Sequence, residues 1–206
     1  MILARLKSET REQHEQLESL VKIMDEGFNV EDYGRLLGRF YRFYSWIEPE
    51  LADSGISREQ FDLEARSKTP SLKNDLMALG AYDATLRGID RPAWLPDLSS
   101  PEKAFGAIYV VEGATLGGQL IARRIARDLG ITPEKGGSFF NSYGSDVGSM
   151  WKEFCERITA FSGDGSRDDE IIGSAKATFS VFAQCLTEVR PEIQPMRVGS
   201  SALVGA

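Results

Sequence analysis

The stretch "YVVEGATLGGQLIARRIARDLG", residues 109–130, decides the fold of this chain. Its apolar residues recur at three- and four-residue steps, which is the spacing of one face of an α-helix. Gly113, Gly117 and Gly118 nevertheless lie inside the pattern. Each interior glycine costs roughly 0.5–1 kcal/mol relative to alanine, because its backbone loses more freedom on folding. The sequence therefore predicts a helix with very little side chain on one face.

Two explanations of these glycines follow from their spacing. Gly113 and Gly117 are four residues apart, so they share a helix face, and Ala114 and Gly118 widen the bare surface. A small-xxx-small pattern commonly brings two helices into close contact. The alternative is a flat ligand that approaches the helix backbone. Which explanation holds depends on what lies opposite this face.

Helical spacing of apolar residues recurs along the rest of the chain, and the alternation typical of strands is not found. Asn29, Thr69 and Ser100 are suited to cap helix N-termini, and Pro70 and Pro101 suit first-turn positions. The expected helices cover residues 2–25, 33–52, 58–68, 70–79, 101–129, 147–161 and 170–189. The sequence predicts an all-α, single-domain fold of about seven helices over residues 1–190 and a loosely ordered tail at 191–206.

Composition limits the classes of function. The 206 residues are 42% hydrophobic and 27% charged, which suits one globular domain with a sizeable core. The net charge of −7 argues against nucleic acid or anionic membrane as a partner. The N-terminus is too charged for a secretory signal, and no stretch approaches the roughly 18 apolar residues of a membrane span. Cys155 and Cys185 are far apart in the sequence, each inside a helical pattern, which is typical of unpaired cysteines in a reducing compartment. We therefore expect a cytoplasmic protein.

His14 is the only histidine in the chain, and it lies on the apolar stripe of the first expected helix. It is either a structural histidine at the edge of the core or a metal ligand. One histidine is too few for a zinc site, but it suffices for heme iron, whose equatorial ligands come from the porphyrin. Glu18, four residues further on, is either the group that orients the imidazole or a solvated charge.

Lys7 and Arg11 precede His14 by seven and three residues, so all three fall near one face of a continuous helix. Positive charge beside a ligand histidine would suit the propionates of heme. Basic residues on an N-terminal helix are also ordinary solvated surface. Spacing alone leaves both interpretations open.

Taken together, "LKSETREQHEQLE" at residues 6–18 and "YVVEGATLGGQL" at residues 109–120 resemble the heme oxygenase family, specifically its bacterial biliverdin-producing members. The resemblance extends over most of the chain except the tail. It implies that His14 is the iron ligand and that Glu18 hydrogen-bonds the other imidazole nitrogen. Residues 109–130 would be a kinked distal helix that crosses the open face of the heme.

The resemblance also implies further site residues. Gly113, Gly117 and Gly118 would lie at the closest approach to heme and dioxygen, and Thr115 is a polar candidate nearby. Ala114 stands where mammalian members carry an aspartate, so the groups that hold distal water are not identified. The cofactor contacts implied by the resemblance, in addition to Glu18, are Lys7, Arg11, Tyr109, Lys152 and Phe179.

By this resemblance the protein is an enzyme that cleaves heme with dioxygen to biliverdin, carbon monoxide and ferrous iron. Heme is then both cofactor and substrate. A reductase or ferredoxin would supply electrons, because the chain has no flavin or nicotinamide motif. A biliverdin-using photoreceptor is one candidate consumer of the product. The alternatives are a heme-binding sensor or carrier without turnover and a helical interaction protein without a cofactor.

Overall fold

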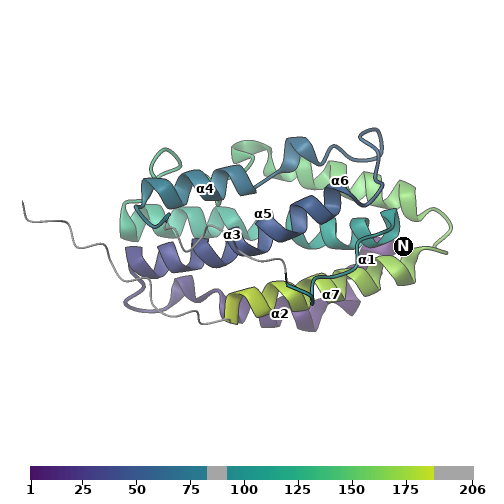
Figure 1. Cartoon of the computed structure of the whole chain (residues 1–206), viewed down its shortest axis with the longest axis horizontal. Helices are drawn as coiled ribbons and strands as arrows, with labels where there is room; N and C mark the ends of the chain where they lie inside the picture. The colour runs from purple at the N-terminus through teal and green to yellow at the C-terminus, as the bar shows by residue number, and fades with distance from the viewer. Residues whose placement is uncertain (83–91, 188–206) are drawn as a thin grey trace, which may run out of the picture.

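The computed structural model describes residues 1–82 and 92–187 of the chain. These residues form seven α-helices and no β-strand, which confirms the predicted all-α fold (Figure 1). The helices are α1 (Ile2–Glu9), α2 (Arg11–Leu20), α3 (Val30–Ala52), α4 (Thr69–Ala78), α5 (Pro101–Leu129), α6 (Val147–Ser162) and α7 (Asp168–Thr187). The predicted domain end at residue 190 and the predicted tail lie outside the described residues.

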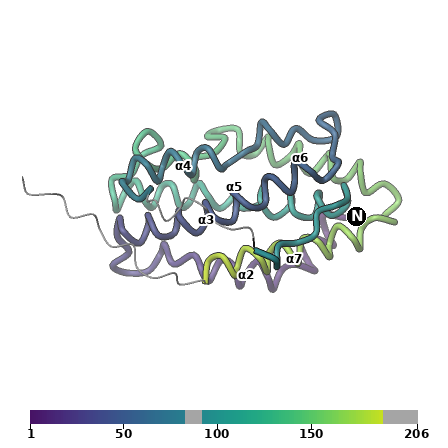
Figure 2. The backbone as a smooth tube through the Cα atoms, in the orientation of Figure 1, coloured from purple at the N-terminus to yellow at the C-terminus, as the bar shows by residue number. Residues whose placement is uncertain are grey.

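Helices α3, α5 and α7 run along the long axis of the molecule (Figure 2). α5 packs most extensively on α7, and α2 and α3 also pack on α7. Gly106 permits the close approach of α5 to α7, because a Cβ atom there would lie only 2.2 Å from the carbonyl oxygen of Ile171. Aromatic rings fill the centre, where Phe43 stacks on Phe182 with 4.0 Å between ring centroids.

Helix caps explain several of the observed boundaries. Asn29 accepts hydrogen bonds from the backbone amides of Glu31 and Asp32, as predicted for a cap. The Ser100 hydroxyl likewise accepts from the Lys103 amide and begins α5. The prediction of Thr69 as a cap is wrong, because Lys68 occupies that position. Instead, the Glu48 carboxylate of α3 accepts hydrogen bonds from the backbone amides of Lys68 and Thr69.

The prediction of one helix over residues 2–25 is wrong. Thr10, with φ −107° and ψ 7°, separates α1 from α2, and Lys22–Met24 form a short 3-10 helix, η1. The Thr10 hydroxyl donates a hydrogen bond of 2.7 Å to the Leu6 carbonyl. The backbone angles of Thr10 depart from the α-helical region and interrupt the regular pattern. Lys7 and His14 therefore lie on different helices, and the register argument that placed them on one face does not hold.

The helix predicted over residues 58–68 is also wrong, since only a 3-10 turn, η2 (Glu64–Arg66), forms there. Local side-chain bonds hold this segment in turns. The Ser57 amide donates to the Gln60 side chain, and the Ala65 amide donates to the Asp62 carboxylate. Short polar side chains of this kind favour turns over helix interiors.

By length and composition, α5 is apolar enough to cross a membrane. The expectation that no stretch of the chain is apolar enough to span a membrane is thus wrong for α5. Half of its most apolar window is buried inside the fold, as in the central helix of a packed domain.

Candidate functional site

A cavity of about 630 Å³ lies among residues of α2, α5 and α7. Its size falls within the range of pockets that hold cofactors, roughly 300–1,000 Å³. Most of the lining is apolar, with Leu17 and Phe182 among the wall residues. The polar side chains in the lining are His14, Glu18 and Tyr109. An apolar chamber with one imidazole is suited to a flat hydrophobic ligand that carries a metal.

His14 and Glu18 lie next to each other on α2, as their spacing predicts. The Nδ1 atom of His14 is 3.6 Å from a carboxylate oxygen of Glu18. Since Nδ1 faces the carboxylate, Nε2 on the opposite side of the ring is left to bind a metal. Phe179 of α7 stands edge-on to the imidazole, with 6.0 Å between ring centroids. The His14 side chain is 54% exposed, which disfavours a buried structural role.

Within residues 1–82 and 92–187, no group of three or more His, Cys, Asp or Glu side chains could hold a metal ion. His14 is therefore not part of such a group among these residues. His14 as sole protein ligand requires a macrocycle that brings its own donors, as heme does.

The glycines of α5 differ in their surroundings. Gly113 and Gly117 line the cavity. A Cβ atom at Gly117 would meet no atom within 4 Å, whereas one at Gly113 would lie 3.9 Å from the Trp151 ring. Gly118 is not among the lining residues, and a Cβ atom there would lie 2.9 Å from the Phe140 carbonyl oxygen. The ligand explanation thus fits Gly113 and Gly117, and the packing explanation fits Gly118.

The other predicted site residues divide into two groups. Tyr109 and Phe179 line the cavity, and burial raises the pKa of the Tyr109 hydroxyl above its usual value. The Thr115 hydroxyl donates to the carbonyl of Glu112, 2.6 Å away, and does not line the cavity.

The basic residues also lie outside the cavity lining. Arg11 pairs with Glu15 at 2.7 Å, and Lys152 lies 3.7 Å from Glu156. Lys7 is exposed on α1. Their contact with heme propionates stays a prediction.

Residues 1–188 match the profile of the family described as Heme oxygenase. The chain belongs to the heme oxygenase family. Heme oxygenases are oxidoreductases that bind and degrade heme. A heme oxygenase from Xanthomonas campestris pv. campestris (strain 8004) is 28% identical over 166 residues, which cover 79% of this chain and 94% of that protein.

Two solved heme oxygenases share the fold. The structure from Leptospira interrogans has a TM-score of 0.74 at 20% identity and covers 91% of this chain and 99% of that chain. Heme oxygenase-1 from the cyanobacterium Synechocystis sp. PCC6803, solved in complex with heme, has a TM-score of 0.71 at 16% identity and covers 90% of each chain.

Sequence reasoning missed part of the heme oxygenase cavity wall. Leu116 and Leu120 line the cavity and are 44% and 59% exposed. Their spacing from Gly113 and Gly117 places all four on one helix face, so helical periodicity alone could have found them. Trp151 of α6 also lines the cavity, and its contact with Gly113 depends on how α6 packs.

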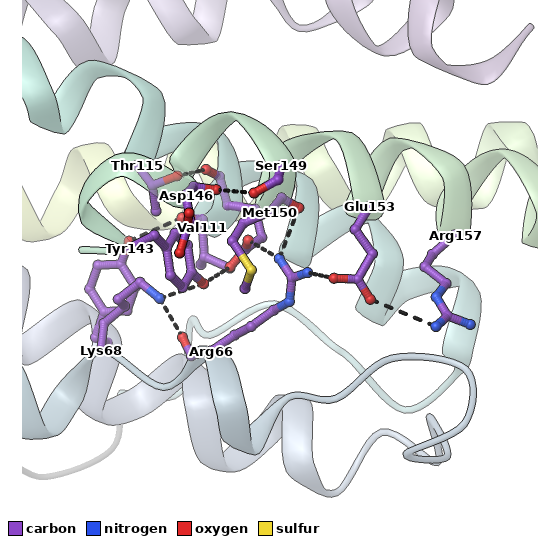
Figure 3. Close-up of polar contacts among 12 residues, drawn as sticks. Arg66, Lys68, Val111, Thr115, Tyr143, Asp146, Ser149, Met150, Glu153 and Arg157 are labelled. Carbon is purple, nitrogen blue, oxygen red and sulfur yellow. Dashed lines mark hydrogen bonds and ion pairs between the residues drawn. The ribbon is translucent and has the colours of Figure 1, made fainter.

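A different side of α5, about 100° around the helix from Gly113, carries a largely buried polar group of residues that sequence reasoning also missed. The Glu112 carboxylate pairs with Arg66 and accepts a hydrogen bond of 2.9 Å from the Tyr143 hydroxyl. The Lys68 ammonium donates to the Tyr143 oxygen at 2.6 Å. Figure 3 shows Lys68 beside Tyr143, with Arg66 extended toward Glu153 of α6. We call this group the back-face cluster; its members are Arg66, Lys68, Glu112 and Tyr143.

Burial lowers the pKa of the Lys68 ammonium from 10.5 to about 8. Between these two values the unfolded chain binds the proton more tightly than the folded protein, so the contribution of Lys68 to stability rises with pH. We expect the free energy of unfolding to increase by roughly 2 kcal/mol more in the wild type than in Lys68→Met between pH 7 and pH 10. Urea titrations at both pH values measure this difference. Equal pH dependence in the two proteins contradicts the prediction.

Proposed function

We propose that this heme oxygenase cleaves heme with dioxygen as co-substrate to give biliverdin, carbon monoxide and ferrous iron. The observation that carries the proposal is the pairing of His14, on one wall of an apolar cavity, with the bare backbone of Gly113 and Gly117 on another. The residues fit heme, because one imidazole is available and the space beside Gly117 is open.

The chain's residues have separate tasks in this proposal. Nε2 of His14 binds iron, and Glu18 orients the ring through Nδ1, as carboxylates do for other metal-bound histidines. Apolar side chains such as Leu116 and Phe182 hold the macrocycle and exclude water. When bound, heme supplies both the oxygen-activating iron and the carbon that is oxidised.

The bare segment of α5 would leave room for a small ligand between the helix backbone and a bound heme. Ala114 lines the cavity at this point and offers no hydrogen-bonding group. Hydrogen-bonding groups on this side of the cavity would therefore come from the helix backbone and from water. Thr115 acts through the helix backbone in this proposal, because its hydroxyl is bonded to the Glu112 carbonyl.

Propionate binding by Lys7, Arg11 and Lys152 requires the propionates to extend beyond the cavity rim, because none of the three lines the cavity. Exposed ion pairs contribute little, about 0–1 kcal/mol each, so the apolar wall supplies most of the affinity. Electrons come from a reductase or ferredoxin. A photoreceptor that uses biliverdin is one candidate consumer of the product.

Heme titration followed by product analysis tests the proposal. We expect a 1:1 complex whose Soret band decays when ascorbate or a reductase is added in air, while a biliverdin band rises and carbon monoxide is released. A heme sensor or carrier would keep its spectrum under the same conditions. A helical interaction protein would bind no heme. Either of these two outcomes overturns the proposed function.

A further inference from the structure

The glycine segment of α5 has little to hold it on the side of the heme cavity. Gly113 and Gly117 offer no side chain, and the space beside Gly117 is open. Each helical residue turns the side chain by about 100°, so Glu112 points well away from the direction of these two glycines. Contacts that fix the rotation of this segment must therefore come from sides of the helix that do not face the cavity.

Glu112 provides such contacts. Its side chain is 3% exposed, and the side chain of its partner Arg66 is 5% exposed. Arg66 also donates to the Met150 carbonyl at 3.2 Å and to the Glu153 carboxylate at 2.8 Å. One guanidinium thus joins the centre of α5 to α6. Its planar array of donors fixes direction as well as distance.

Tyr143 adds a second link. Its hydroxyl donates to Glu112 and accepts from Lys68, whose ammonium also donates to the Arg66 carbonyl at 2.6 Å. The Tyr143 backbone has φ +63°, the left-handed region that favours glycine. A tyrosine in this conformation is strained and persists only where its surroundings hold it. The hydrogen bonds of the back-face cluster hold Tyr143 in this conformation.

Stability alone does not account for a buried ionic cluster. Apolar side chains of similar volume often stabilise a core as well as a buried ion pair does, because removing charges from water is costly. The directional bonds of the cluster instead specify one rotation of α5. That rotation decides whether bare backbone or a side chain faces the cavity.

We propose that the back-face cluster positions the glycine segment of α5 against the heme site. Its members are positioning residues, since none of them lines the cavity beside His14. The inference rests on the proposed function for its catalytic consequence. Its structural content, the immobilisation of residues 113–118, is independent of heme.

Tyr143→Phe tests the proposal, because it removes one hydroxyl and keeps the ring. Tyr33→Phe is the matched control, since it removes a buried tyrosine hydroxyl that donates to the Gly136 carbonyl at 3.0 Å and not to α5. In the heme-free proteins we expect amide hydrogen exchange at residues 113–118 to be about 3- to 10-fold faster in Tyr143→Phe, the effect of one lost hydrogen bond on local opening. The control should leave exchange in this segment unchanged.

With heme bound, Tyr143→Phe should keep heme affinity within about twofold and shift the stretching frequency of iron-bound carbon monoxide, while kcat falls. Equal exchange at residues 113–118 in the two variants overturns the proposal. If Tyr143→Phe does not fold, Lys68→Met supplies the same comparison by removing the donor to Tyr143. Failure to bind heme contradicts the proposed function and leaves the exchange result to decide the positioning role.

Discussion

In a His14→Ala variant we expect the spectrum of histidine-ligated heme to disappear and turnover to fall by more than about 100-fold, since loss of only the group that hydrogen-bonds a ligand histidine costs about 10- to 100-fold in metal sites. No second histidine exists in the chain to replace the ligand. The heme-free variant should melt within a few degrees of the wild type, because the side chain is half-exposed. Absorption spectra, turnover and thermal melts measure the three quantities.

Added imidazole should restore part of the spectrum and of the turnover in His14→Ala, since truncation leaves space for it in the cavity. Gln16→Ala on the same helix is the control, because Gln16 does not line the cavity. A variant that keeps the wild-type heme spectrum and activity would disprove the ligand assignment.

In a Gly117→Leu variant we expect turnover to fall by about 100-fold or more while the heme-free protein melts no lower than the wild type. The leucine side chain would enter the space that is open beside Gly117, which the proposed function leaves for a small ligand. The helix itself gains up to roughly 1 kcal/mol in propensity, because an interior glycine is replaced. Turnover assays and melts of the heme-free protein measure the two effects.

Gly118→Ala is the matched control, and we expect it to lower the stability of the heme-free protein, which Gly117→Leu should not do. Its Cβ atom would lie 2.9 Å from the Phe140 carbonyl oxygen, so the loop or the helix must shift. Overpacking of this sort typically costs about 1–3 kcal/mol of stability with or without heme. A Gly117→Leu protein that stays active, or that loses stability as Gly118→Ala does, contradicts the assignment of Gly117 to the cavity.

Helical periodicity predicted the all-α fold and much of the cavity lining. Both depend on which residues share one face of a single helix, and sequence spacing gives that directly. His14 and Glu18 on α2, like Gly113 and Gly117 on α5, are each four residues apart, and the structure keeps each pair together. The break at Thr10 escaped prediction, because it is a change of backbone angles at one residue within an apolar pattern that continues across it.

The back-face cluster could not be predicted in the same way. Its members come from η2 and its flank, from α5, and from the loop before α6, and 77 residues separate Arg66 from Tyr143. None of these segments has a period that points to the others. Tertiary packing brings them together. Tertiary packing also gives Gly118 surroundings that differ from those of Gly113 and Gly117.

The site also sets an order of events during synthesis. Among the described helices α1 and α2 are made first, yet both pack on α7, which is made last of them. At roughly 5–20 residues per second, the ribosome needs about 7–30 s to pass from α2 to α7. Throughout that interval the apolar side of α2 has no α7 to cover it. The nascent chain therefore cannot complete the cavity around His14 until α7 has been synthesised, and a ribosome stalled before residue 168 would hold a protein unable to form this site.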